Sequence, residues 1–251
     1  VENAWYYYAL SAAGEMAQIL GKNADLSFIA ERKSVIENGY SALLTESGFK
    51  SDDVKNPDDR ANALAVLSGL AGKEQYEAIT KVLTDTKNSS PYMEYYVLEA
   101  LCEMEQYEAA YDRIRSRYED MMSEDYSTLW EFWDSWRGTK NHAWSGGPLV
   151  IMSKHFAGIV PIEAGYEKVE INPQYALSDS MTCTVPGVKG LITLDYKKTA
   201  DKYIINLALP QDMKAELYIP DGADVNINSD AYFRNGEYVN RNDGNVEITE
   251  K

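Results

Sequence analysis

The spacing of apolar residues changes once along this chain, near residue 158. Before that point apolar residues recur every three or four positions, which is the period of an amphipathic helix. After it they alternate with polar residues in steps of two, which is the period of a half-buried strand. The two patterns occupy separate stretches of the chain, which indicates a run of helices followed by a run of strands rather than an alternation of the two. We therefore predict an α + β multidomain chain, with helices over residues 1–160 and an antiparallel β-sandwich over residues 161–251.

Cap and turn residues bound the helices that we expect in the first part. Residues 4–20 and 25–46 are predicted as two helices, and Gly21 can supply the left-handed residue that ends the first one. With a last helix at about 143–157, the pattern predicts roughly seven helices. Two of the later helices open on a capping residue followed by proline, namely Asn56 with Pro57 and Ser90 with Pro91.

An internal repeat lies inside the helical part. The stretch "LSGLAGKEQYEAI" at 67–79 matches "LEALCEMEQYEAA" at 98–110 with an offset of 31 residues. A recurring helix–turn–helix unit indicates stacked helical hairpins. An α-solenoid of the tetratricopeptide type is the alternative, but the period and the consensus of that repeat are absent here.

The second part contains short alternating segments separated by turn sequences. "VPGVKG" and "IPDGAD" favour turns, because proline presets φ and glycine tolerates a positive φ. Short strands at this spacing are typical of a sandwich. The segments expected to form strands are "GYEKVEINPQ", "SMTCTVPGVKGLITLDYKKT", "DKYIINLALP", "KAELYIPDG" and "GNVEITEK".

Charge and cysteine content exclude several classes of function. The net charge of −16 argues against binding to nucleic acid, and the chain has no run of about 20 apolar residues that could cross a membrane. Cys102 and Cys183 lie far apart without metal-ligand spacing, so we predict two packed thiols. No metal and no cofactor is predicted. The two thiols are compatible with a cytoplasmic, a periplasmic or a secreted protein, so the compartment stays open.

The segment "STLWEFWDSWRGTKNHAWSGG" at 127–147 holds four of the five tryptophans and the carboxylates Glu131 and Asp134. Aromatic rings suit the apolar faces of sugars, and glycosidases work with a pair of carboxylates. Structural packing is the alternative, because tryptophans three residues apart commonly belong to a core. Asp134 fits an orienting residue, a cap or plain surface equally well. His155 is predicted to have a structural role.

Several stretches of the sequence together resemble the bacterial α-L-rhamnosidases of glycoside hydrolase family 78. They are "TLWEFW", "NHAWS" and "PIEAGYEKVEINPQ", and they occur in the family's order and at similar spacing. The resemblance implies the second half of an (α/α)6 barrel, a toroid of the six-hairpin glycosidase type, followed by the C-terminal β-domain.

The resemblance also implies a reaction and a set of site residues. It implies an inverting hydrolase that removes terminal α-L-rhamnosyl residues from a rhamnose-containing oligosaccharide or glycoside. Glu131 falls in the family's TxWE motif and would be the general base. The other residues that would bind the sugar are Trp130, Trp133, Asn141, His142 and Trp144.

The sequence departs from the family pattern in its first part. It contains no counterpart of the family's general acid and only about half of the barrel's helices. The sequence also begins inside a helical pattern, so we expect a C-terminal piece of a longer enzyme, inactive by itself. Asp58 and Asp59 are better explained as helix-dipole partners.

The resemblance leaves a question of association and two alternative functions. Apolar helix faces turned toward a missing half predict an oligomer or a partner fragment. The alternatives to a rhamnosidase are another six-hairpin glycosidase and a non-catalytic helical-repeat and β-sandwich module that binds carbohydrate or protein.

Overall fold

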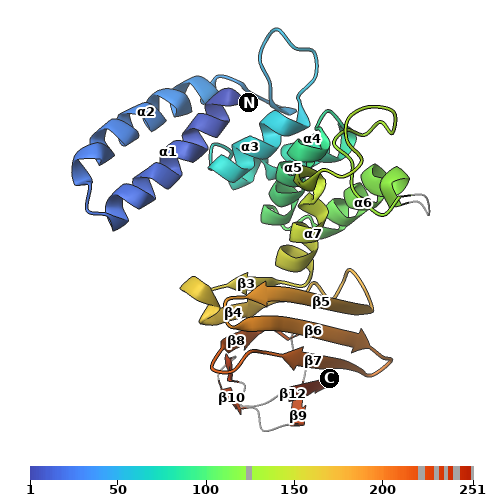
Figure 1. Cartoon of the computed structure of the whole chain (residues 1–251). Coiled ribbons are helices and arrows are strands. Elements are labelled where there is room, and N and C mark those ends of the chain that lie inside the picture. The colour runs from blue at the N-terminus through green and yellow to red at the C-terminus, as the bar shows by residue number, and fades with distance from the viewer. Residues whose placement is uncertain (123–125, 220–223, 229–231, 235–236, 240–243, 250–251) are drawn as a thin grey trace. The chain divides into compact units, whose positions relative to one another are not determined.

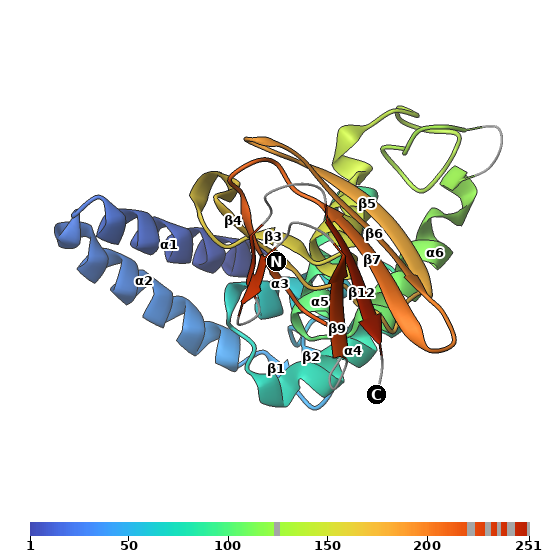
Figure 2. The same ribbon diagram turned by 90° about the horizontal axis from the view of Figure 1, so that it is seen from below.

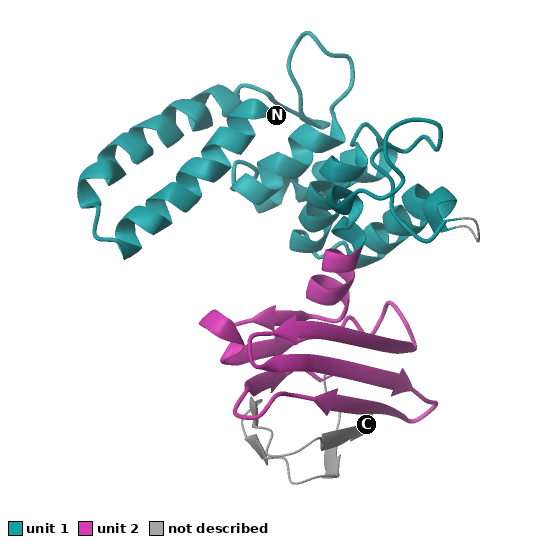
Figure 3. Cartoon of the chain, in the orientation of Figure 1, with its two compact units in different colours: residues 1–148 teal, residues 149–251 magenta. Residues whose placement is uncertain are grey.

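The computed structural model describes the chain except residues 123–125, 220–223, 229–231, 235–236, 240–243 and 250–251, with side chains described up to residue 219. The chain divides into two compact units, Val1–Pro148 and Leu149–Lys251, which Figure 3 colours separately.

The first unit consists mainly of three successive helical hairpins, as the repeat predicts (Figure 1). The first hairpin pairs α1 with α2, which run side by side in both views (Figures 1 and 2). Gly21 has φ +67° directly after α1 and its cap, so the predicted left-handed residue is confirmed. The bounds are α1 Glu2–Ile19, α2 Asn23–Ser41, α3 Asp59–Ser68, α4 Tyr76–Asp85, α5 Pro91–Glu103 and α6 Tyr107–Tyr118.

The sequence repeat coincides with the turns inside the second and third hairpins. Its first copy runs from the end of α3 through a short 3-10 turn, Lys73–Gln75, into α4, and its second copy runs from α5 into α6. Tyr76 and Tyr107 are matched residues, and each is the first residue of its helix. The repeat therefore encodes the turn that folds each hairpin.

Two helix boundaries differ from the sequence prediction. The predicted cap at Asn56 is wrong: α3 begins at Asp59, and Asp58 is its N-cap, accepting a hydrogen bond from the Arg60 backbone N–H at 2.9 Å. Asparagine and aspartate can both cap a helix, and the bidentate pair that Asp58 forms with Arg60 favours the later start. The predicted helix 25–46 ends early, because β1 Leu44–Thr45 and β2 Gly48–Phe49 form a small antiparallel hairpin.

The remaining helical predictions agree in part with the structure. Ser90 caps α5 and Pro91 is its first residue, as predicted. The helix expected near 143–157 is a series of three short pieces: a 3-10 turn at Ala143–Ser145, α7 Gly147–Ile151 and a π-helical turn at Met152–Phe156. Seven α-helices are therefore present in the described part of the chain.

The core of the first unit lies between α3 and α5. These helices pack against each other, and both bury residues on nearly every face. A helix that is buried on several faces must have neighbours on several sides. The arrangement agrees with the inner layer of a toroid of hairpins. The most buried apolar residues of this layer are Ala63, Leu64, Ala65, Val97, Leu98, Ala100 and Leu101.

The second unit contains two five-stranded sheets. One has the strand order β10-β11-β8-β4-β3 and the other the order β5-β6-β7-β12-β9. Their inward residues share one core, so the unit is a β-sandwich, as predicted. The bounds are β3 Ile159–Pro161, β4 Lys168–Ile171, β5 Ser180–Gly187, β6 Gly190–Lys198, β7 Lys202–Ala208, β8 Lys214–Leu217, β9 Asp224–Asn228, β10 Tyr232–Arg234, β11 Glu237–Val239 and β12 Gly244–Thr249.

One strand pair departs from the antiparallel prediction. β4 and β8 run parallel, with Val169 opposite Ala215, whereas the other pairs formed by the described residues are antiparallel. A parallel pair needs a long crossover, and here β5, β6 and β7 of the other sheet lie between the two strands in sequence. No helix in the described part of the chain is long and apolar enough to cross a membrane.

Candidate active site

The segment that follows Tyr126 is a folded loop, which we call the tryptophan loop (residues 126–142). It contains no regular helix, and two backbone hydrogen bonds close it. The N–H of Glu131 donates to the carbonyl of Thr139 at 2.9 Å, and the N–H of His142 donates to the carbonyl of Leu129 at 3.0 Å. These bonds bring the two ends of the predicted site segment together.

Gly138 makes the reversal of the tryptophan loop possible. Its φ is +67°, and an added Cβ would lie 2.5 Å from the Phe132 ring and 2.9 Å from Oε2 of Glu131. A side chain at this position would therefore meet both a positive φ and the carboxylate itself. The glycine lets the chain pass close behind Glu131.

The carboxylate of Glu131 is held through one oxygen. Oε2 accepts hydrogen bonds from the backbone N–H of Thr139 at 2.9 Å and from its hydroxyl at 3.2 Å. Nδ1 of His142 lies 3.8 Å from the same oxygen and 3.0 Å from the Thr139 hydroxyl. Among the described residues, Oε1 has no hydrogen-bond partner. The side chain is 21% exposed, so a solvent molecule or ligand can reach a carboxylate whose position is fixed.

The predicted tryptophans divide into two groups. Trp144 is 41% exposed, its ring centroid lies 4.1 Å from that of His142, and its Nε1 donates to the carbonyl of Glu131 at 3.3 Å. Trp130, by contrast, is 2% exposed and packs with Tyr118 and Met121 in a small core. The structure thus brings Trp144 and His142 beside Glu131, whereas the Trp130 ring faces the interior.

The other predicted residues lie at different distances from the carboxylate. Trp133 is half-buried, and its Nε1 donates to the carbonyl of Ser89 at 2.8 Å. Asn141 is exposed next to His142. Asp134 pairs with Arg137 at 3.1 Å on the surface, which supports the surface alternative for that residue.

Sequence reasoning missed a row of aromatic rings that continues from Trp144. The Tyr92 ring lies 5.6 Å from Trp144 and 5.6 Å from Tyr96, which in turn meets Trp5 edge-on at 4.7 Å. Trp5 and Tyr92 belong to the first turns of α1 and α5. The available signal was the presence of aromatic residues in the first turns of two helices, "AWYYY" and "PYMEYY".

The described residues contain no group of three His, Cys, Asp or Glu side chains that could hold a metal ion. Cys102 and Cys183 are free thiols, and burial raises the pKa of the Cys183 thiol. Neither cysteine belongs to the tryptophan loop. The side chains that this chain brings together at the site are a carboxylate, an imidazole and aromatic rings.

The sequence of this chain matches the models of two protein-family domains, one for each part of the chain. Residues 1–156 match the model of the bacterial α-L-rhamnosidase six-hairpin glycosidase domain, which agrees with the stacked hairpins of the first unit. Residues 158–234 match the bacterial α-L-rhamnosidase C-terminal domain. The chain belongs to the bacterial α-L-rhamnosidase family, glycoside hydrolase family 78.

Solved structures show the same fold. The α-L-rhamnosidase of Dictyoglumus thermophilum is 18% identical with a TM-score of 0.79, and the match covers 99% of this chain and 32% of that one. The family 78 rhamnosidase of Bacillus sp. GL1 is 22% identical with a TM-score of 0.73, covering 87% and 26%. The Streptomyces avermitilis α-L-rhamnosidase, solved with L-rhamnose, is 20% identical with a TM-score of 0.75, covering 99% and 26%.

The chain spans about a third or less of the length of these three structures. No curated protein matches it. The predicted fold, a partial α/α toroid followed by a β-sandwich, is confirmed by the family models and by the structural matches.

Proposed function

We propose that this chain supplies the general-base side of an inverting α-L-rhamnoside hydrolase, with Glu131 as the base. The observation that carries the proposal is the way Glu131 is held. Thr139 fixes Oε2 with two hydrogen bonds, and Oε1 has no partner among the described residues. A carboxylate held in this way can take a proton from a water molecule at a constant position. Membership of the rhamnosidase family supports the assignment.

The proposed substrate is a rhamnose-containing oligosaccharide or glycoside. L-Rhamnose presents C–H faces and a methyl group as well as hydroxyls. The exposed ring of Trp144 suits the C–H faces, while the imidazole of His142 and the amide of Asn141 can hydrogen-bond hydroxyls. The neighbour from Streptomyces avermitilis was solved with L-rhamnose, which agrees with this choice of sugar.

We propose that the general acid lies outside this chain. In an inverting pair the two carboxyl groups stand about 6.5–9.5 Å apart with a water molecule between them. Asp134 is the other acid of the site segment, but it is tied to Arg137 at the surface. Because the chain spans a third or less of the matched structures, the rest of the barrel would bring the acid, and this chain alone would be inactive.

The test is Glu131→Gln in an enzyme that contains this chain together with the rest of the barrel. Glutamine keeps the shape of the side chain but cannot accept the proton, so kcat should fall at least ~100-fold. Asp134→Asn is the matched control, because it removes a carboxylate from the same loop, and its kcat should stay within about twofold of the wild type.

Each outcome of this test has a defined meaning. Full activity in the Glu131→Gln variant would show that another group is the base. A wild-type enzyme that hydrolyses a different glycoside but no rhamnoside would overturn the choice of sugar. The anomeric configuration of the rhamnose first released, followed by NMR, checks the stereochemistry, and net retention would contradict an inverting reaction.

A further inference from the structure

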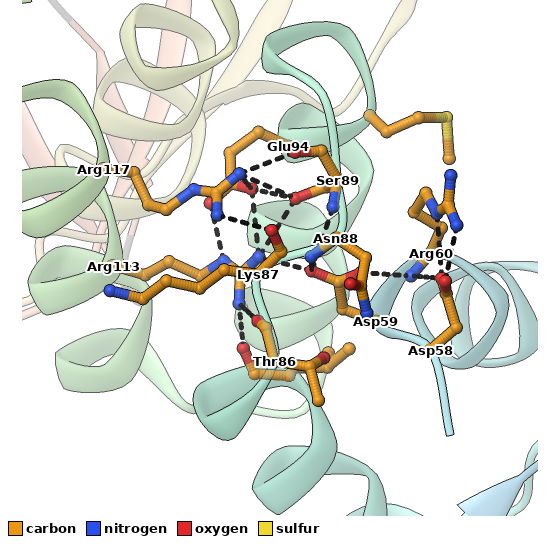
Figure 4. A network of polar contacts seen from close by, with 12 residues as sticks. Asp58, Asp59, Arg60, Thr86, Lys87, Asn88, Ser89, Glu94, Arg113 and Arg117 are labelled. Carbon is orange, nitrogen blue, oxygen red and sulfur yellow. Dashed lines mark hydrogen bonds and ion pairs between the residues drawn. The ribbon is translucent and has the colours of Figure 1, made fainter. Parts of the chain in front are cut away.

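Four charged side chains from three helices, each at most 7% exposed, form one network, the buried charge network (Figure 4). It consists of Asp59 in α3, Glu94 in α5, and Arg113 and Arg117 in α6. Arg113 donates from Nε to Glu94 at 2.6 Å and from Nη2 to Asp59 at 2.7 Å. Arg117 lies 3.6 Å from the other oxygen of Glu94. Asp59 is therefore more than a helix-dipole partner, because it joins its helix to α6.

The network balances its charges. Two carboxylates face two guanidinium groups, and arginine stays protonated in proteins. Burial alone would lower the pKa of Arg113, but the hydrogen bond and the ion pair with Glu94 raise it. Burial lowers the pKa of Arg117 below its usual value. A buried network with this many directional contacts has few alternative geometries, so it provides a rigid support.

Trp133 connects the tryptophan loop to this support. Its indole N–H donates to the carbonyl of Ser89 at 2.8 Å, and the same carbonyl accepts a hydrogen bond from Arg117 at 2.6 Å. The guanidinium carbon of Arg117 lies 4.2 Å from the centre of the Trp133 ring. Tyr118 meets that ring edge-on at 5.0 Å. A hydrogen bond, a cation–π contact and an aromatic contact together fix the ring in place.

Glu131 lies between two such attachment points. On one side Trp130 is buried in the small core, and its carbonyl accepts a hydrogen bond from the Ser145 hydroxyl. On the other side, two residues beyond Glu131, Trp133 is hydrogen-bonded to Ser89 and stacked with the guanidinium of Arg117. The segment between the two attachment points is too short to move far, so the position of the carboxylate depends on both.

We propose that Trp133 and Arg117 are positioning residues: the buried charge network holds the tryptophan loop through Trp133, and so presents Glu131 at a constant place. Trp133 thereby changes from a predicted sugar-binding residue to a support of the site. The inference rests on the proposed role of Glu131 as general base. Small displacements of a catalytic group cost much rate, and ~1 Å of misplacement can cost ~100-fold.

The test uses Trp133→Phe, which keeps an aromatic ring near Arg117 but removes the indole donor to Ser89. Trp136→Phe is the matched control, because Trp136 lies in the same loop and is 79% exposed. The first readout is hydrogen exchange in this chain. We expect the loop amides of Glu131 and His142 to exchange at least ~10-fold faster in Trp133→Phe, while amides of α5 and α6 keep their rates.

The second readout is kinetic and uses the enzyme with the complete barrel. Trp133→Phe should lower kcat ~10- to 100-fold and change KM less than about threefold, because the base is misplaced while the sugar-binding surface remains. Trp136→Phe should change neither. Arg117→Lys, which keeps the charge but loses the planar group over the indole, should give an intermediate fall in kcat.

The two readouts separate this inference from the proposed function. Unchanged exchange of the loop amides in Trp133→Phe would overturn the inference, whatever the enzyme hydrolyses. Faster loop exchange with an unchanged kcat would also overturn it, because the loop would then move without affecting the base. If the wild-type enzyme has no rhamnosidase activity, the proposed function fails, and the exchange experiment still decides whether the network holds the loop.

Discussion

Replacing Arg113 with methionine tests the most connected residue of the buried charge network. Methionine has a similar unbranched shape, so the change removes the charge and the donors without opening a large cavity. The guanidinium of Arg113 donates to Glu94 at 2.6 and 3.0 Å and to Asp59 at 2.7 Å, and it also reaches the carbonyls of Leu83 and Thr86. All of these bonds are lost together in the variant.

The expected cost comes from the carboxylates that remain. Asp59 and Glu94 are fully buried, and after the substitution only Arg117 is left to balance two negative charges. Removing one partner of a buried ionic group typically costs about 3–5 kcal/mol. Adding the separate hydrogen bonds at ~1.5–3 kcal/mol each would overestimate the loss, because they belong to one network and are not additive.

The assay is urea unfolding followed by circular dichroism at 222 nm, which reports mainly on the helical first unit. With an m-value of about 2 kcal/mol per molar urea, a loss of ~4 kcal/mol lowers the midpoint by ~2 M. Arg115→Met is the control, because Arg115 lies on the same helix but is exposed, and its midpoint should stay within about 0.3 M.

A further variant separates the loss of charge balance from the loss of packing. Adding Asp59→Asn to Arg113→Met removes one of the two stranded charges and should recover part of the lost midpoint. The reasoning would be refuted if Arg113→Met unfolded within the error of Arg115→Met. A double variant less stable than Arg113→Met alone would also contradict it, because removing an unbalanced buried charge should raise the stability.

Two further predictions concern the sandwich and the surface of the first hairpin. Gly158→Ala should destabilise the second unit by at least ~2 kcal/mol more than Gly165→Ala. Both glycines have a positive φ, which costs ~1–2 kcal/mol for alanine. Only at Gly158 would the new Cβ also clash, because it would lie 2.0 Å from the carbonyl oxygen of Asn172. Equal losses of Tm would contradict this. The exposed apolar face of α1 and α2, with Ile19 at 84% and Phe28 at 54% exposure, should make the chain elute above its 28.3 kDa, and Ile19→Lys should shift it toward the monomer. A wild-type monomer that persists at high concentration on size exclusion would refute the second prediction.

Much of the fold was predictable because it is encoded locally. The 31-residue repeat located the hairpin turns, and the alternating segments located β4 to β8 and β12. The strands missed were β1 and β2 in the first unit and β3, β9, β10 and β11 in the second; β1 and β2 have two residues each, and β3, β10 and β11 have three. Such short strands form because a neighbour already offers its backbone groups, and this is not visible in their own residues. The parallel pairing of β4 with β8 was not predicted either, because the choice of a neighbouring strand is made by the fold and is not visible in the residues of one strand.

The candidate site was predictable in part. The segment motifs identified Glu131, His142 and Trp144, which the structure brings into contact with one another or with Thr139. They could not distinguish Trp144 from Trp130, because both are tryptophans in one aromatic segment. The difference is set by Tyr118 and Met121 from the preceding helical region, which enclose Trp130 and leave Trp144 exposed.

The sequence by itself determined the positions of the paired helices, the longest strands and the hairpin turns, since periodicity, caps and glycine positions act over a few residues. The tertiary structure alone decided which charges meet. Asp59 has the local setting of a helix-dipole residue, yet its carboxylate is fully buried and pairs with Arg113, 54 positions later. A buried charge is costly unless a group of opposite charge compensates it. The packing of α3, α5 and α6 decides which group that is, and neighbours in sequence do not.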